Sequence, residues 1–336
     1  MQRYGPYGKW VSQGINETRP QPPPLDEVKL RLFCIPPAGM GGWCFHGWAN
    51  ELPSDVEVMP IELPARSTRF DEAVPYAASI PELARSLVDG LALEVLTARP
   101  FAIFGHSFGA WVAYEMCQEL ARRAEAGWPL PLKLYVSAYR PPQLAGITND
   151  PDLLTPTIGD LNDEDFWVAF ERRYGRNPDL QAPTTREFVI PILRADFSLI
   201  EAYVPSTSEP LSIPLCAVCA CGDARCRPQQ LSAWSQCCVA RDSPESADFQ
   251  ERWFEDVLRP AEWATEHRYI VNNPLALLRF LNMDLPLVGQ PVEGYTGVAG
   301  PMKAASDPVT TGPCVRRAVE AVEANPEETS SRCSVE

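Results

Sequence analysis

Short apolar runs alternate with amphipathic stretches along most of the chain. Helical spacing of apolar positions is clearest over Ile80–Ala98 and Trp111–Arg123. The runs that predict buried strands are Val28–Ile35, Val56–Ile61, Phe101–Phe104, Leu132–Ser137 and Ile213–Ala220. This alternation predicts an α/β fold, with a mostly parallel sheet covered by helices on both faces.

The pattern changes between about residues 146 and 204, where no run indicates a strand. Asp163–Tyr174 and Thr184–Tyr203 instead have the spacing of amphipathic helices. A helical insertion between consecutive strands predicts a lid over the site at the end of the sheet. The alternative is a packing appendage without a gating role.

The remaining segments define the domain organisation. Residues 1–27 are polar and rich in proline, which predicts a loosely ordered extension, and residues 286–336 have the composition of a disordered tail. One domain is expected over residues 28–285, with a polar surface insertion at about 240–263. Residues 267–271 are expected at a strand-to-helix junction, before a helix from about Pro274 to Leu281.

Charge and hydropathy exclude several classes of partner. The 336 residues carry a formal net charge of −15, which argues against binding to nucleic acid or to an anionic membrane surface. No apolar run approaches the length of a membrane span. The first residues have no apolar core of the secretory kind, so we expect no signal peptide and a cytoplasmic localisation.

Eleven cysteines raise the question of a metal site. Their densest cluster comprises Cys216, Cys219, Cys221, Cys226, Cys237 and Cys238. The first three fall in a strand-like segment, where alternate side chains point to opposite faces and a buried cysteine behaves as a small hydrophobic residue. We therefore expect reduced thiols, no zinc and no other cofactor.

The stretch Gly105-His106-Ser107-Phe108-Gly109 follows one predicted strand directly and opens a predicted helix. A strand that reverses sharply into a helix forces Ser107 into a strained backbone conformation, and the flanking glycines remove side chains that would clash. The hydroxyl is held above the sheet, and the free N–H groups of the helix point at negative charge that develops there. This predicts a nucleophile; the alternative is a tight turn of an ordinary doubly wound sheet.

A serine nucleophile needs a base, and the chain has three histidines. His106 adjoins Ser107 and should point away from its hydroxyl, and His46 starts a helix. His267 lies late in the chain, where a loop could reach the hydroxyl. With this turn the usual order is serine, acid, histidine, which favours His267 as the base.

The acid is expected after a strand between Ser107 and His267. Asp223 has that position, and it would hold the imidazole in the right tautomer. Asp196, the rival, falls inside a predicted lid helix. The N–H groups of Phe108 and of Ala38, with Gly39 as second choice, are the expected donors to an oxyanion.

Together these segments resemble the type II thioesterases, stand-alone α/β-hydrolases that serve polyketide, nonribosomal-peptide and fatty-acid synthases. The segments that carry the resemblance are IPPAGMGGWCFHGWA, IELPARSTRF, FGHSFGAWVAYE, SAYRPP, LRADFSLIEAY, GDARCRPQQLSAW and HRYI. The resemblance implies the α/β-hydrolase fold, a helical lid and the same five site residues. Thr265-Glu266 stands where the family usually has two glycines, and Ala65 stands where its LPGR motif has glycine.

The resemblance implies hydrolysis of acyl thioesters on the phosphopantetheine arm of a carrier protein, in trans. A basic patch of Arg172, Arg173 and Arg176 is a candidate docking surface; the alternative is a solvated helix face. Two other functions remain open at this point: a small-molecule carboxylesterase or lipase with the same triad, and a non-catalytic binding protein on a hydrolase scaffold.

Overall fold

A six-stranded, entirely parallel sheet forms the centre of the protein in a computed structural model that describes residues 7–12, 24–239, 249–255 and 265–286. The strand order is β2-β1-β3-β4-β5-β6. The strands are β1 (Leu30–Ile35), β2 (Val56–Pro60), β3 (Phe101–His106), β4 (Leu134–Ser137), β5 (Leu215–Ala220) and β6 (Phe249–Phe254). The predicted α/β class and parallel sheet are confirmed.

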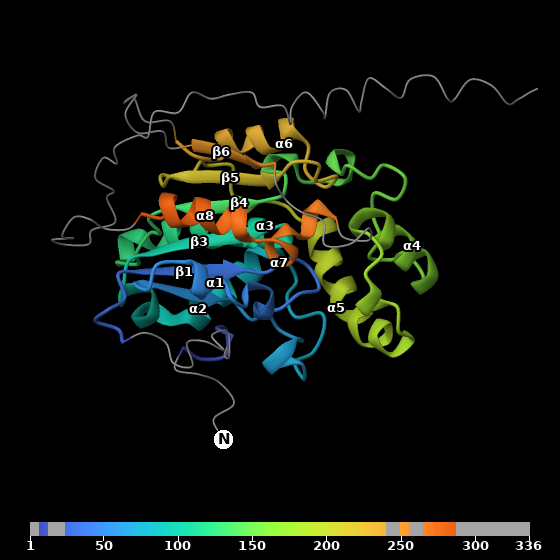
Figure 1. Cartoon of the computed structure of the whole chain (residues 1–336), viewed down its shortest axis with the longest axis horizontal. Helices are drawn as coiled ribbons and strands as arrows, with labels where there is room; N and C mark the ends of the chain where they lie inside the picture. Colours follow the sequence, from blue (N-terminus) through green and yellow to red (C-terminus); the bar gives the residue numbers. More distant parts are fainter. Residues whose placement is uncertain (1–6, 13–23, 240–248, 256–264, 287–336) are drawn as a thin grey trace, which may run out of the picture.

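Helices cover both faces of this sheet (Figure 1). α1 packs against α8 on one face, and α2 packs against α3 on the other. The helices are α1 (Trp48–Glu51), α2 (Ile80–Thr97), α3 (Phe108–Arg123), α4 (Asp163–Tyr174), α5 (Pro183–Glu201), α6 (Pro228–Ser232), α7 (Tyr269–Asn272) and α8 (Leu275–Asp284). Within the described residues, none is both long enough and apolar enough to cross a membrane.

Aromatic side chains fill the space between α1 and the sheet. Phe45 meets Trp48 edge to face at a centroid distance of 5.0 Å, and Trp48 meets Phe104 of β3 at 5.1 Å. Such pairs add about 0.5–1.5 kcal/mol each beyond the burial of their area. The strand that leads to the candidate nucleophile is therefore held firmly.

The expected surface insertion at 240–263 is wrong for Phe249–Phe254, which form the edge strand β6. Its residues pair in parallel with β5, from Phe249 opposite Leu215 to Phe254 opposite Ala220. Five of its six residues keep some exposure, so Gln250, Glu251 and Arg252 made this edge strand resemble a polar loop. Residues 240–248 and 256–264 of the expected insertion lie outside the described residues.

Two further expectations differ from the structure. Residues 267–271 form no strand: Glu266–Arg268 is a turn of 3₁₀-helix that leads directly into α7. The expected loose extension at 1–27 is wrong for residues 7–12, because Val11 bridges Ile61 antiparallel and Trp10 is buried beneath the Arg69 guanidinium. The expected tail from residue 287 onward lies outside the described residues.

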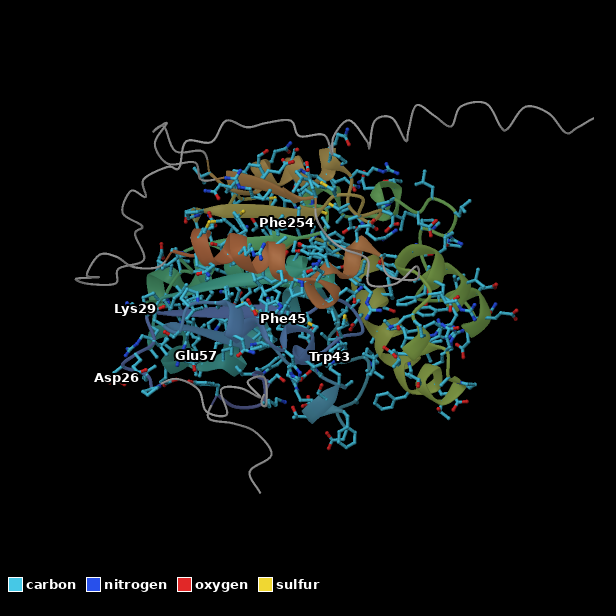
Figure 2. The ribbon with its side chains drawn as sticks, viewed as in Figure 1. Asp26, Lys29, Trp43, Phe45, Glu57 and Phe254 are labelled. Carbon is cyan, nitrogen blue, oxygen red and sulfur yellow. The ribbon has the colours of Figure 1, made fainter. Side chains whose placement is uncertain are left out.

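The segment predicted to be a lid, called the lid below, lies between β4 and β5 and contains the two predicted helices, α4 and α5 (Figure 1). It occupies the same side of the molecule as Trp43, whereas Asp26 and Lys29 lie at the opposite end of the sheet (Figure 2). The loop that leaves β1 touches the lid directly, because a Cβ on Gly39 would lie 2.4 Å from Leu193 of α5. The lid therefore stands at the carboxyl ends of the strands.

Candidate active site

Ser107 occupies the sharp turn between β3 and α3. Its backbone has φ 53° and ψ −124°, a strained conformation for a residue with a side chain. Its N–H donates to the carbonyl of Ser137 at the end of β4 (2.8 Å), and its own carbonyl accepts from Ala110 (2.8 Å). The sheet and the first turn of α3 thus hold the serine in place.

The two glycines of the turn allow α3 to approach the sheet closely. A Cβ on Gly105 would lie 2.2 Å from the carbonyl oxygen of Gly109 and 2.8 Å from Cβ of Ala113. A Cβ on Gly109 would lie 2.4 Å from the carbonyl oxygen of Ile35. The second contact brings the start of α3 against the loop that follows β1.

The structure brings Ser107, His267 and Asp223 into one line of hydrogen bonds. Nε2 of His267 lies 3.0 Å from Oγ of Ser107, and its Nδ1 lies 2.9 Å from Oδ2 of Asp223. An ionised carboxylate can only accept, so Nδ1 carries the proton and Nε2 accepts from the serine hydroxyl. All three residues are buried, with 4–7% of their surface exposed.

Asp223 is held as a carboxylate by its neighbours. The backbone N–H of Arg225 donates to Oδ1 at 2.8 Å, and the Cys219 thiol lies 3.6 Å from Oδ2. Burial raises the pKa of this carboxyl, but the His267 ring and the Arg225 hydrogen bond outweigh burial and leave the pKa below its ordinary value. Asp223 is therefore ionised when it faces the imidazole.

His106 points away from the serine hydroxyl, as expected, and supports His267 from behind. Its Nε2 lies 2.8 Å from the His267 carbonyl oxygen, which can only accept, so Nδ1 accepts from the Ser137 hydroxyl at 2.7 Å. The Ser137 oxygen in turn accepts from the Tyr269 hydroxyl at 2.5 Å. Burial, followed by the charge of His267, lowers the pKa of His106 to about 3, so this histidine is neutral.

The loop Pro36–Gly42, here called the oxyanion loop, carries the other predicted donors. The Gly39 N–H donates to Oδ2 of Asp196 at 2.6 Å and is therefore engaged. Ala38, the first choice, and Phe108 at the start of α3 therefore remain the expected oxyanion donors. Asp196 itself contacts Arg66, Tyr76 and Gly39, whereas Asp223 contacts His267.

Sequence reasoning missed an aromatic contact between the lid and the histidine. The ring of Tyr174, the last residue of α4, lies 5.4 Å from the ring of His267. Phe166 and Phe170 precede it at intervals of four residues, and Phe170 lies 5.0 Å from Tyr174. That spacing, visible in the sequence, places all three on one helical face.

The basic patch expected on the lid is wrong for Arg173. This side chain is 2% exposed and its Nε lies 3.0 Å from Oδ2 of Asp152. Arg172 binds the same carboxylate at 2.7 Å, while Arg176 lies on the surface and contacts Gln181. The carboxylate of Asp152 therefore balances one of the three expected positive charges within the lid.

Two cysteines of the cluster lie in the predicted strand, whereas Cys221 follows the strand and is disulfide-bonded, so the expected reduced state is wrong for Cys221. Cys216 and Cys219 are buried in β5, and burial raises the pKa of both thiols. Across the part of the chain that the structure describes, no three histidine, cysteine or acidic side chains are grouped so that they could hold a metal ion.

Both departures from the family pattern have a structural counterpart. Ala65 keeps a left-handed conformation, with φ 65°, which glycine adopts without strain. The Glu266 side chain packs beside Gly222, where a Cβ would lie 3.1 Å from its Oε1. The longer residue before His267 thus lies against the loop that carries Asp223.

Comparison with known proteins agrees with this architecture. The thioesterase domain family matches residues 30–285. The chain is 33% identical to the gramicidin S biosynthesis protein GrsT of Aneurinibacillus migulanus over 213 residues, which are 62% of this chain and 77% of GrsT. It is 32% identical to the thioesterase PikA5 of Streptomyces venezuelae over 67% of this chain and 74% of PikA5.

The fold matches solved thioesterases as well. RedJ, the thioesterase of the prodiginine biosynthetic pathway in Streptomyces coelicolor, superimposes with a TM-score of 0.65 at 28% identity, covering 81% of this chain and 97% of RedJ. The expected α/β-hydrolase fold and the expected family are confirmed. The chain belongs to the thioesterase family.

Proposed function

We propose that the protein hydrolyses acyl thioesters from the phosphopantetheine arm of a carrier protein, in trans, by way of an acyl-enzyme on Ser107. The observation that carries the proposal is the hydrogen-bonded line from Ser107 through His267 to Asp223, within a chain whose family match spans residues 30–285. The names of GrsT and RedJ connect these two relatives with biosynthetic pathways, and PikA5 is named a thioesterase, which supports a synthase carrier domain as the partner.

In the proposed first step, Oγ of Ser107 attacks the thioester carbonyl while Nε2 of His267 takes its proton. Asp223 stabilises the imidazolium, and the N–H groups of Ala38 and Phe108 receive the negative charge on the carbonyl oxygen. The carbon–sulfur bond breaks, and the thiol of the phosphopantetheine arm leaves with the proton. Water then attacks the ester carbonyl while His267 takes a proton from the water, the bond between the carbonyl carbon and Oγ of Ser107 breaks, His267 returns the proton to Oγ, and the free acid departs.

The aromatic side chains of the lid favour a substrate with an apolar acyl group. Phe166 and Phe197 are almost fully buried, and Tyr174 links this aromatic group to His267. Apolar walls beside the reacting carbonyl bind an acyl chain and exclude water. Because a carrier domain must be in the same compartment as the enzyme, we propose that both act in the cytoplasm.

A hydrolysis panel tests the proposal. Carrier proteins loaded with acyl groups of different length and branching are compared with simple aryl esters, using wild-type enzyme, Ser107→Ala, and Ser232→Ala as an exposed control serine. We expect turnover of carrier-bound thioesters that disappears in Ser107→Ala and persists in Ser232→Ala. Turnover confined to aryl esters would favour the carboxylesterase, and failure of a fluorophosphonate to label Ser107 would favour the binding protein.

A further inference from the structure

Asp196 of the lid helix α5 lies at the centre of a buried group of hydrogen-bond donors. Its Oδ1 accepts from Nη2 of Arg66 at 2.9 Å and from the Tyr76 hydroxyl. Its Oδ2 accepts from Nη1 of Arg66 at 3.0 Å and from the Gly39 N–H at 2.6 Å. Asp196 is fully buried, and its carboxylate accepts all four of these hydrogen bonds from three residues.

A second contact joins the same helix to the same loop. Leu193, one turn before Asp196, lies against the Cα of Gly39, where an added Cβ would come within 2.4 Å of its Cδ2. Residues three apart share one face of a helix, so Leu193 and Asp196 reach the oxyanion loop together. Gly39 has φ +74°, and no other residue type could occupy this position without strain and a clash.

Arg66 ties this contact to the rest of the loop. Its Nη1 also donates to the Met40 carbonyl at 3.2 Å, and its Nε donates to the Pro64 carbonyl at 3.0 Å. The guanidinium thus holds the residue after Gly39 while the carboxylate holds Gly39 itself. Ala38 precedes Gly39 directly, so the direction of its N–H depends on how these two neighbours are fixed.

We infer that Asp196 is a positioning residue that fixes the oxyanion loop, so that the oxyanion hole is complete only while α5 is docked against Gly39. The inference rests on the proposed function in so far as Ala38 is an oxyanion donor. In this arrangement α5 is part of the catalytic framework. Opening of the lid to admit a substrate must then take place in segments other than the Leu193–Asp196 turn.

The test uses variants of the full-length protein and an aryl ester, so it does not depend on the carrier substrate. Asp196→Ala removes the acceptor of the Gly39 N–H. Glu201→Ala is the matched control, because Glu201 belongs to the same helix and also accepts backbone N–H groups, those of Ile158 and Gly159, in another loop. Reaction with a fluorophosphonate to completion counts the folded sites in each preparation.

Loss of a buried ion-pair partner destabilises the fold, so one more variant separates stability from positioning. Arg66→Met combined with Asp196→Leu replaces the pair by apolar side chains of similar size, an exchange that is often neutral or stabilising. Gly39 still lacks its acceptor in this double variant. A purely structural role predicts that activity returns with stability, whereas a positioning role predicts that it does not.

For Asp196→Ala we expect kcat per labelled site to fall about a hundredfold with little change in KM, because small displacements of catalytic groups have effects of that size. A trifluoromethyl ketone, which forms an oxyanion on addition of Ser107, should bind weaker by a similar factor. The double variant should stay slow, and Glu201→Ala should match wild type.

Three results would each overturn the inference: kcat per labelled site in Asp196→Ala within threefold of wild type, recovery of activity in the double variant, or an equal loss in Glu201→Ala. If the wild-type enzyme hydrolyses the aryl ester but no carrier-bound thioester, the proposed function is refuted. The inference about Asp196 is then still decided by the aryl-ester measurements.

Discussion

The buried His106 predicts a specific acid sensitivity of the fold. Its folded-state pKa of about 3 lies below the ordinary value of 6.5, because burial and the charge of His267 both disfavour the imidazolium. Between these values the unfolded chain binds a proton that the folded protein does not. The stabilisation is therefore fully present above pH 6.5 and is lost progressively as the pH falls towards 3.

The size of this effect follows from the two pKa values. Each pH unit between them changes the free energy of unfolding by up to about 1.4 kcal/mol. Going from pH 7 to pH 5 should therefore remove about 2 kcal/mol through His106 alone. Gln at this position does not titrate, yet its amide offers one donor and one acceptor for the His267 carbonyl and the Ser137 hydroxyl.

Urea unfolding at pH 7 and pH 5 measures this contribution. His106→Gln should lose about 2 kcal/mol less than wild type between the two pH values, although its stability at pH 7 is lower. His46→Gln, which removes an exposed histidine, is the matched control and should follow wild type. Equal pH dependence in wild type and His106→Gln would refute the assignment of His106 as a buried neutral base.

Three further substitutions test the loop at Ala65, the turn at Ser107 and the triad. Ala65→Gly should raise the free energy of unfolding by about 1 kcal/mol in urea, because glycine adopts φ 65° without strain; a decrease would contradict this reasoning. Gly105→Ala should lower the free energy of unfolding by about 1–3 kcal/mol and slow fluorophosphonate labelling, because the new Cβ would lie 2.2 Å from the Gly109 carbonyl oxygen. Unchanged labelling would show that α3 can shift without moving Ser107. Asp223→Asn should reduce kcat by about 10⁴ through the wrong imidazole tautomer, and a loss below tenfold in steady-state kinetics would exclude Asp223 as the acid.

The sequence was informative wherever local chemistry decides the structure. Fully buried strands are continuous apolar runs, and the Gly105–Gly109 turn has its own steric requirements, so both were predictable. The order of Ser107, Asp223 and His267 along the chain was sufficient to select three residues that the fold brings into contact.

Contacts between residues far apart in the chain were not predictable in the same way. His106 meets Ser137 because β3 and β4 pair at that register, and Asp196 meets Arg66 across 130 residues of chain. Neither pair leaves a periodic pattern. Strand β6 was missed for a different reason, since an edge strand keeps polar residues that apolar periodicity does not detect.

The most direct measurement of the central claim is the mass of the enzyme during turnover of an acyl-carrier thioester. After rapid acid quenching, intact-protein and peptide mass spectrometry should find one acyl group on the peptide that contains Ser107, and Ser107→Ala should show neither the adduct nor hydrolysis. Hydrolysis that persists in Ser107→Ala, or an acyl group bound to another residue, would contradict the proposed mechanism.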